Sequence, residues 1–415
     1  MPRLYCGFDF GTSNTVVTVI NETGETLALI ADASVLFLPD CGARAQERYV
    51  GAEAVERYVQ SGMVGRFIQS IKSVLPDPAF RGTEIFEKRY TAEELVAMVL
   101  SHFRSAVEQE LGVSIDRAVF GRPVKFSDEP ERDRLAEERL TAAAERCGFR
   151  DVTLEFEPVA AARRFASLVS PGLHALVCDF GGGTSDFSVI SVDDQFRIVV
   201  PANHGVRVGG DDFDGEIMWH RLIPYFGYGT DYESFGRMLP VPVHIYQALR
   251  QWERIAFLKT SQYREDLRYI HSGASDRIAI EWLMKLIDED LGFALFQAIR
   301  DAKHALSDED SAAVVFFEHG LELKERIYYD EFASYIEGEI ANVSKAIERV
   351  LRDAELSAGD VRALFLTGGS SFARPLQDRV TGMFPGAQIR LDSDRFNSVS
   401  LGLASRAREI GLTIS

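Results

Sequence analysis

Two stretches of the chain repeat one pattern of an acidic residue, a glycine-containing turn and hydroxyl-bearing residues. The first is LYCGFDFGTSNTVVTVI at residues 4–20, and the second is LVCDFGGGTSDFSVI at residues 176–190. In each copy an apolar run ends at Asp-Phe-Gly and a second run follows the turn, which predicts strand, turn and strand. Glycines allow successive backbone N–H groups to approach a polyphosphate, and Thr12, Ser13 and Thr184 add hydroxyl donors. Two such turns indicate a phosphate clamp built from two related lobes.

Each turn follows an aspartate at the end of its predicted strand, Asp9 in the first copy and Asp179 in the second. If the two lobes face each other, these carboxylates lie on opposite sides of one cleft, close to a bound triphosphate. Two carboxylates beside a triphosphate need a cation to relieve their repulsion, and we expect Mg²⁺, held partly through water. The alternative is that both aspartates only stabilise tight turns, and the same alternative holds for Asp186.

Composition and missing motifs exclude several other classes of protein. There is no G-x-x-x-x-G-K-[ST] loop and no G-x-G-x-x-G. A formal net charge of -18 would repel a phosphate backbone, so nucleic acid is not an expected partner. The cysteines are scattered without zinc-ligand spacing. No apolar run reaches the ~18 residues that cross a bilayer, and no signal peptide precedes the first predicted strand, so we expect a cytoplasmic protein without a membrane partner.

The intervening segments predict the helices and strands that position the two turns. Residues 91–111 place apolar residues at helical spacing behind Thr91, and Glu94 completes a capping box. Residues 224–242 are rich in Gly, Pro and aromatic residues and predict an irregular, exposed segment. We also expect strands at 118–123 and 361–367, a strand and helix over 151–166, and helices at 129–147, 209–222, about 243–265, about 288–306 and beyond 398.

The motifs together resemble those of the DnaK-type seventy-kilodalton heat-shock protein (heat shock protein 70) family, within the actin and sugar-kinase superfamily. DFGTSN at 9–14 is similar to the first phosphate turn of that family, and DFGGGTSD at 179–186 is similar to the second. FEPVAAA at 156–162 resembles its connecting segment, GGDDFD at 209–214 its G-G-E-D-F-D, and TGGS at 367–370 its adenosine-side glycine pair. The motifs follow the order of the family over nearly the whole chain.

This resemblance implies an α/β protein with the actin-like ATPase fold, in which two ribonuclease-H-like lobes enclose a nucleotide cleft. It places lobe I at 1–172 with an inserted subdomain at about 39–111, lobe II at 173–395 with one at about 216–310, and a C-terminal helix at 396–415. ATP or ADP and Mg²⁺ are the implied cofactors. Because the chain ends after a helix, we expect the nucleotide-binding domain only, without the peptide-binding domain of the family.

The resemblance also assigns roles to individual side chains. Glu157 would orient the attacking water and the metal shell, Lys72 would reach the γ-phosphate, and Pro123 would belong to a switch between the lobes. Without the resemblance, Glu157 is an acid at a helix start, Lys72 a solvated residue and Pro123 a turn residue. The implied catalytic residues are Asp9, Lys72, Glu157, Asp179 and Thr184, with Asp9, Glu157 and Asp179 around the metal. The implied nucleotide-binding residues are Gly11, Thr12, Ser13, Asn14, Gly181, Gly182, Gly183, Thr184, Gly209, Gly210, Lys303, Ser307, Gly368, Gly369 and Ser370.

The segment that would bind adenosine departs from the family pattern. AKHALS is similar to the adenosine helix of the family and carries Lys303 and Ser307 at the expected positions. Arg300, however, stands where the family has a glutamate, His304 where an arginine would stack on the base, and Phe396 at an aspartate position. The sequence therefore predicts preserved phosphate contacts and altered base recognition.

Three functions are compatible with these residues. The first is a slow Mg²⁺-dependent ATPase that acts as a chaperone-like conformational switch, with a protein client or co-chaperone as its partner. The second is a small-molecule kinase of the same superfamily, which would need an aspartate that deprotonates a substrate hydroxyl; the sequence offers no clear candidate. The third is a non-catalytic interaction or filament protein that uses ATP to set its shape. The sequence predicts neither the oligomeric state nor a role for residues 224–287.

Overall fold

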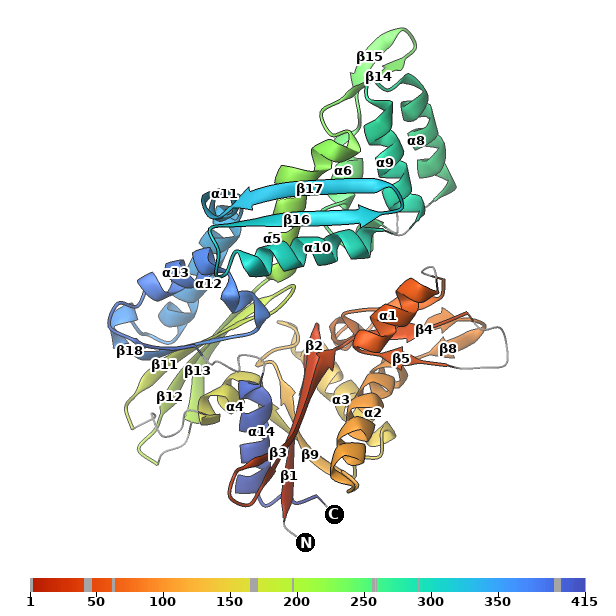
Figure 1. Cartoon of the computed structure of the whole chain (residues 1–415). Coiled ribbons are helices and arrows are strands. Elements are labelled where there is room, and N and C mark those ends of the chain that lie inside the picture. The colour runs from red at the N-terminus through yellow and green to blue at the C-terminus, as the bar shows by residue number, and fades with distance from the viewer. Residues whose placement is uncertain are drawn as a thin grey trace.

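The computed structural model describes residues 3–40, 47–61, 64–164, 171–195, 198–255, 258, 260–289, 291–391 and 397–414. Two five-stranded sheets form its framework, one in each half of the chain (Figure 1). The first has the order β10-β9-β1-β2-β3 and the second the order β13-β12-β11-β18-β19. The strands of the first are β1 (Leu4–Phe10), β2 (Asn14–Asn21), β3 (Thr26–Ala33), β9 (Arg117–Arg122) and β10 (Asp151–Phe156). Those of the second are β11 (His174–Phe180), β12 (Ser185–Val192), β13 (Ile198–Val206), β18 (Val361–Thr367) and β19 (Gln388–Leu391).

The two sheets share one topology, which confirms the repeat seen in the sequence. In each, three strands form an antiparallel meander, and two further strands add in parallel beside the first strand of that meander. Phe10 pairs with Thr15 at the end of the first hairpin, and Phe180 pairs with Ser185 at the end of the second. The four-residue turns between them therefore occupy equivalent positions of two equivalent sheets.

Helices α2 (Ala92–Leu111) and α3 (Pro130–Arg146) belong to the core of the first sheet. The predicted capping box starts α2: the Thr91 hydroxyl accepts the Glu94 N–H at 3.3 Å, and the Glu94 carboxylate accepts the Thr91 N–H at 2.9 Å. Between β3 and α2 lie β4 (Leu36–Leu38), β5 (Tyr49–Val50), α1 (Ala52–Gln60), β6 (Arg66–Ile68), the 3₁₀ turn Ile71–Val74, β7 (Thr83–Ile85) and β8 (Lys88–Tyr90).

Two helices fill the space between the sheets, α4 (Glu157–Arg164) and α14 (Ser398–Glu409), as Figure 1 shows. Their apolar residues share one core cluster with side chains of both sheets. The helices approach closely because Gly402 has no side chain: a Cβ there would lie 1.8 Å from the carbonyl oxygen of Ala160. A Cβ at Gly7 of β1 would likewise lie 2.2 Å from the Ser400 carbonyl oxygen. The connection between the lobes is therefore packed backbone against backbone.

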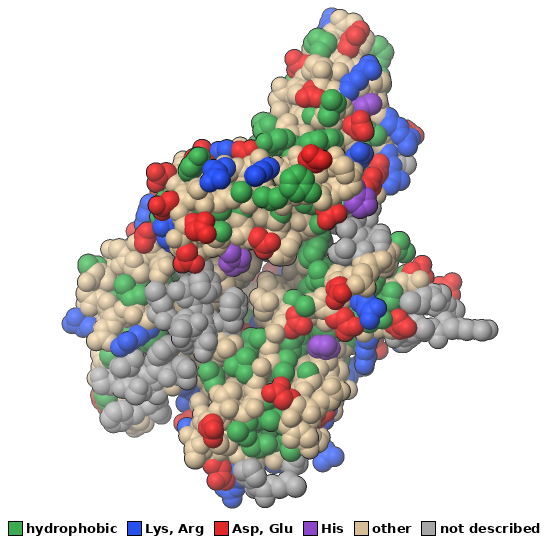
Figure 2. Space-filling view, viewed as in Figure 1, with side chains coloured by type: hydrophobic (Ala, Val, Ile, Leu, Met, Phe, Trp, Pro, Cys, Tyr) green, Lys and Arg blue, Asp and Glu red, His purple; other side chains and the backbone are tan. Residues whose placement is uncertain are grey.

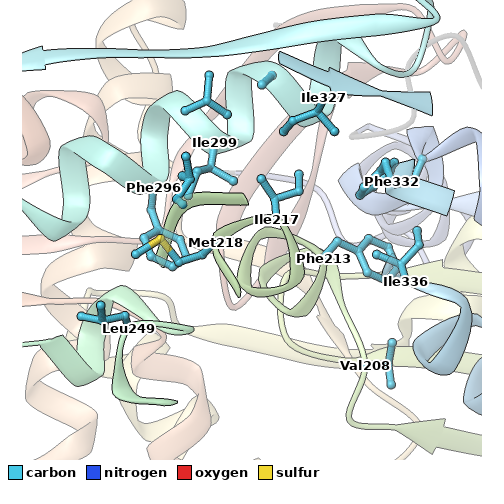
Figure 3. Close-up of a cluster of buried hydrophobic side chains, with 14 of the residues drawn as sticks. Val208, Phe213, Ile217, Met218, Leu249, Phe296, Ile299, Ile327, Phe332 and Ile336 are labelled. Atoms are coloured by element: carbon cyan, nitrogen blue, oxygen red, sulfur yellow. The ribbon is translucent and has the colours of Figure 1, made fainter. Parts of the chain in front are cut away.

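The part of the second lobe farthest from the first sheet is built around α5 (Gly210–Ile217). Figure 3 shows Phe213 and Ile217 of this helix among Phe296, Ile299, Ile327 and Phe332 from other elements.

The other elements of this region are the π turn Met218–Leu222, the 3₁₀ turn Ile223–Phe226, β14 (Asp231–Ser234), β15 (Arg237–Pro240), α6 (Val243–Ala248), α7 (Trp252–Ile255), α8 (Ser261–Gly273), α9 (Arg277–Asp288), α10 (Gly292–Ala305), β16 (Ser311–Glu318) and β17 (Leu321–Tyr328). Toward the second sheet follow α11 (Tyr329–Tyr335), α12 (Glu337–Asp353), the 3₁₀ turns Ala358–Asp360 and Gly369–Phe372, and α13 (Arg374–Gly382).

Two predictions for this region are wrong. The single helix expected at 243–265 is divided, because the Thr260 hydroxyl accepts the N–H of Tyr263 and starts a new helix. The segment expected to be irregular contains the β14–β15 hairpin, whose two turn residues Phe235 and Gly236 both have positive φ. In each case a short-range hydrogen-bonding or turn signal outweighed the composition of the segment. The predicted subdomain bounds stay predictions.

None of the helices in the described ranges is long and apolar enough to span a membrane.

We expect Gly402→Ala to lower the free energy of unfolding by roughly 1–3 kcal/mol, because its methyl group would collide with the backbone of α4. Urea denaturation followed by circular dichroism measures this change. Gly338→Ala in α12 is the matched control, since its methyl group meets open space and the change raises helix propensity. Equal stability of the two variants would show that α14 does not need the close approach.

Candidate functional site

The two glycine-containing turns adopt the same hydrogen-bonded conformation. The Gly11 N–H donates to the Asn14 carbonyl at 3.0 Å, and the Gly181 N–H donates to the Thr184 carbonyl at 2.9 Å. Thr12, Ser13 and Asn14 of the first turn are exposed, as are Gly183 and Thr184 of the second. The sequence repeat therefore produces two turns of one geometry whose hydroxyl-bearing residues are open to a ligand.

The two turns approach each other at Ser13 and Gly182. A Cβ at Gly182 would lie 2.7 Å from the Ser13 hydroxyl and 3.0 Å from a carboxylate oxygen of Asp211. The first and second copies, about 170 residues apart in the sequence, thus line one site. A larger residue at 182 would displace the side chains of Ser13 and Asp211.

The second turn is held by the start of α5, the helix opened by GGDDFD. The N–H of Gly210 donates to the Gly181 carbonyl at 3.1 Å, and the N–H of Asp211 donates to the Gly182 carbonyl at 2.7 Å. A Cβ at Gly209 would lie 2.2 Å from the Gly182 carbonyl oxygen, so only glycine fits there. Gly209 and Gly210 therefore help to hold the second turn in place.

The TGGS segment after β18 supports the same turn from the other side. The Ser370 hydroxyl donates to the Gly181 carbonyl at 2.7 Å. Gly368 has φ +81°, and a Cβ there would lie 2.3 Å from the Phe180 carbonyl oxygen. Gly369 begins the following 3₁₀ turn. The Thr367 hydroxyl, which sequence reasoning did not single out, donates to the Asp179 carboxylate at 3.0 Å.

Lys72 and Glu157 form an ion pair at 2.8 Å, although 85 residues separate them. Their side chains are only 9% and 14% exposed, so water screens this pair weakly. Burial alone would lower the pKa of Lys72, but Glu157 and Asp9 outweigh it and raise that pKa above its ordinary value. Lys72 is therefore held as a cation at the acidic strand ends.

Burial and repulsion by neighbouring carboxylates raise the pKa values of Asp9 and Asp179. Burial contributes most to the raised pKa of Asp9, followed by Glu157, while Lys72 opposes the shift. The pKa of Asp179 rises to about 6, again through burial and then Glu157, against the hydrogen bond from Thr367. The three carboxylates exceed the charge of the single lysine, so the cluster favours an added cation.

Asp186 belongs to the same cluster, because it pairs with Asp179 across the β11–β12 hairpin. Burial, followed by the charges of Asp179 and Glu157, raises the pKa of Asp186 to about 7. Pro123, Glu157, Asp179 and Asp186 line a small cavity between the lobes. Within the described residues, no group of three His, Cys, Asp or Glu side chains is arranged to hold a metal ion directly. The predicted metal set, Asp9, Glu157 and Asp179, therefore stays a prediction.

Gly121 of β9 is a site residue that the sequence motifs did not indicate. A Cβ there would lie 3.2 Å from Cγ of Glu157 and 3.6 Å from a carboxylate oxygen of Asp9. Glycine at this position lets the two carboxylates approach across the strand. The signal in the sequence that could have indicated Gly121 is a lone glycine inside an apolar strand.

Lys303 binds the same helix start that holds the second turn. Its ammonium donates to the Gly210 carbonyl at 2.8 Å and pairs with Asp214, a buried residue, at 2.7 Å. Burial raises the pKa of Asp214, and Lys303 opposes that shift. Asp214, like Thr367 and Gly121, is a residue whose role the motifs alone did not disclose.

The other residues of the predicted adenosine helix lie along α10, which also carries Lys303, or just beyond its end. The Ser307 N–H donates to the His304 carbonyl at 3.0 Å just beyond its end. Arg300 lies over the ring of Phe293 at 5.6 Å, and its buried Nη2 has no hydrogen-bond acceptor in the described part of the chain. Phe293 in turn meets Phe67 of the first lobe, with ring centroids 5.9 Å apart. Phe396 lies outside the described residues.

Two lobes of one topology, with paired turns and acidic strand ends converging between them, define the actin-like ATPase fold class. The sequence profile of the Hsp70 protein family matches residues 70–228 and 288–408, more than half of the chain, and the chain belongs to that family. It is 26% identical over 412 residues to the Chaperone protein DnaK of Mycoplasmopsis synoviae (strain 53). This match covers 97% of the chain and 58% of that relative, so the chain spans less than two thirds of its length.

We expect Asp186 to make the free energy of unfolding fall as pH rises from about 4 to about 7 in metal-free buffer. Its carboxyl pKa is 3.8 ordinarily and about 7 in the fold, so over this range the folded chain holds a proton that the unfolded chain has lost. Stability from this group is complete below pH 3.8 and declines by up to ~1.4 kcal/mol per pH unit above it. Urea titrations across the range should show a flatter decline for Asp186→Asn.

The exposed Asp194 provides the control for this measurement. Asp194→Asn should follow the wild-type pH dependence. Parallel curves for the wild type and Asp186→Asn would contradict the raised pKa.

Proposed function

We propose that the chain is a slow, Mg²⁺-dependent ATPase that acts as a chaperone-like conformational switch. The observation that carries this proposal is the contact of the two equivalent turns at Ser13 and Gly182, beside the buried pair of Lys72 and Glu157. Backbone N–H groups and hydroxyls of both turns would then bind the phosphates from two sides. Membership of the Hsp70 family supports ATP rather than another polyphosphate as the ligand.

The residues fit Mg²⁺ as a water-bridged cofactor. Asp9, Asp179 and Glu157 surround the region with excess negative charge, and their oxygens are the ligand type that Mg²⁺ prefers. Bound there, the cation would neutralise charge on the phosphates. Thr367 fixes one oxygen of Asp179 by its hydrogen bond.

Lys72 and Glu157 would exchange partners during hydrolysis. In the structure each neutralises the other at 2.8 Å. A γ-phosphate would compete for the ammonium of Lys72, and the carboxylate of Glu157 would then be free to orient a water in line with that phosphate. Thr184, exposed on the second turn, would donate its hydroxyl to the phosphate.

The helices between the sheets would transmit a conformational change at the site to the surface of the molecule. Glu157 is the first residue of α4, and α4 packs backbone to backbone on α14. A rotation of one lobe against the other would therefore pass through these two helices. The proposed partner of such a switch is a protein client or co-chaperone, and the proposed location is the cytoplasm.

The purified chain should bind ATP with Mg²⁺ and release phosphate slowly without an added acceptor. Lys72→Ala should lower the rate on the order of 10³-fold, because it removes the cation that balances transition-state charge. Glu157→Gln should also abolish turnover while keeping the shape of the side chain. A malachite-green phosphate assay measures the rate, and isothermal titration measures binding.

Lys324→Ala on the exposed face of β17 is the control, and it should leave the rate unchanged. Circular dichroism would verify that all variants fold. Turnover that survives both site substitutions would refute the assigned roles. Phosphate transfer only in the presence of a small-molecule acceptor would identify a kinase instead.

His304→Arg should tighten ATP binding about fivefold, because a guanidinium stacks on an adenine ring better than an imidazole. The imidazole is exposed, so the larger side chain fits without repacking. Titrations with ATP and GTP measure the effect and its base specificity. Unchanged affinity for ATP would place the base away from residue 304.

A further inference from the structure

A sheet with one solvated face usually has apolar residues on its inward face and polar residues on its outward face. The β16–β17 hairpin departs from this pattern on its outward face. On the inward face both strands carry buried apolar residues. On the outward face β17 carries Glu322, Lys324 and Arg326, whereas the paired positions of β16 are Phe317, Val315 and Ala313. Val315 is 46% exposed and Phe317 57% exposed. In Figure 2, hydrophobic and charged side chains lie next to each other over the region of this hairpin.

Strand β16 also has an open edge. Within the described residues β16 pairs with β17 alone. Its eight residues include no Lys, Arg or Pro, the residues that commonly protect an edge strand from pairing with another chain. An exposed apolar strand with unpaired backbone groups along one side is a template for a further strand.

A groove of about 320 Å³ runs between this edge and α10. Its helix side includes Ala294, Ala298 and Asp301, which the spacing of four and three residues places on one face of α10. The two alanines leave room for side chains of an added strand. Among the residues that the structure describes, the charged ones that line the groove are Asp301 and Glu318, with no Lys or Arg.

We propose that this groove binds an extended segment of a partner protein, which adds as a strand to β16 and carries alternating apolar side chains and at least one Lys or Arg. Backbone hydrogen bonds along β16 would supply affinity. Val315, Phe317 and the space above Ala298 would accept the apolar side chains. Asp301 and Glu318 would select the basic one.

A second copy of this chain fits the groove less well. Each copy has a formal net charge of -18, and edge-to-edge pairing of two β16 strands would bring two acidic grooves together. The acidic lining therefore favours a basic partner segment over self-association.

The test is a fluorescence-anisotropy titration with the labelled peptide Lys-Val-Thr-Val-Thr-Val-Lys. We expect saturable binding to the whole chain. Ala298→Glu, which fills the groove with a good helix former, should weaken binding about tenfold or more. Asp301→Lys should weaken binding of this peptide and strengthen binding of the same peptide with Glu in place of Lys. Lys324→Glu, on β17 outside the groove, is the matched control and should not weaken binding.

Two N-methylated peptides test strand addition itself. Successive N–H groups of a strand point to opposite sides, so methylating the valine nitrogens blocks one edge and methylating the threonine nitrogens blocks the other. Only one of the two peptides should lose binding. No binding at about 1 mM, or binding that Ala298→Glu leaves unchanged, would overturn the proposal. A peptide-free dimer in sedimentation equilibrium that Ala298→Glu abolishes would also overturn it, since the face would then join copies of this chain.

Discussion

An imbalance of charge at the meeting point of the two lobes is the constraint on which the rest of the structure depends. Lys72 faces Glu157, Asp9 and Asp179, and most of this cluster is withdrawn from water. Burial of uncompensated carboxylates raises their pKa values and costs stability, so the surrounding fold must supply that free energy. Among the described residues it does so through apolar clusters, of which the three largest lie in each lobe and around the helices between them. The site is thus strained electrostatically while its framework is packed tightly, which suits a site that gains stability when it binds a cation and a polyphosphate.

The two lobes are copies of one topology, yet they differ at the positions that matter for charge. Asp9 pairs with Val16 in the first hairpin, whereas Asp179 pairs with Asp186 in the second. The second hairpin therefore carries one more acidic side chain than the first, and its turn is also held by α5, Ser370 and Gly368. The first turn is tied mainly by its own hairpin and by the Ser34 N–H, which donates to the Ser13 carbonyl at 2.8 Å. The two copies therefore share one turn geometry and differ in the contacts that hold each turn.

Helix α10 connects the proposed site with the surface of the second lobe. Lys303 reaches inward from this helix to the start of α5. Ala294, Ala298 and Asp301 lie on another face, against the groove beside β16. Both sets of residues belong to one helix. A segment bound in the groove would therefore contact the same helix that positions Lys303. Arg300 of the same helix lies over Phe293, which contacts Phe67 of the first lobe, and its buried Nη2 has no hydrogen-bond acceptor among the described residues.

The sequence by itself determined the repeat, the two turns with their aspartates, the capping box of α2 and the order of the family motifs. These signals are local, because a turn or a cap depends on hydrogen bonds between residues a few positions apart. It predicted the helix at 243–265 wrongly because the Thr260 cap was not recognised. Only the tertiary structure decided that Ser13 lies against Gly182, that Lys72 pairs with Glu157 and not with solvent, and that Gly121, Asp214 and Thr367 belong to the site. These contacts join residues dozens to hundreds of positions apart. Their energy comes from burial and from charges brought close together, and neither has a signature in the spacing of residues along the chain.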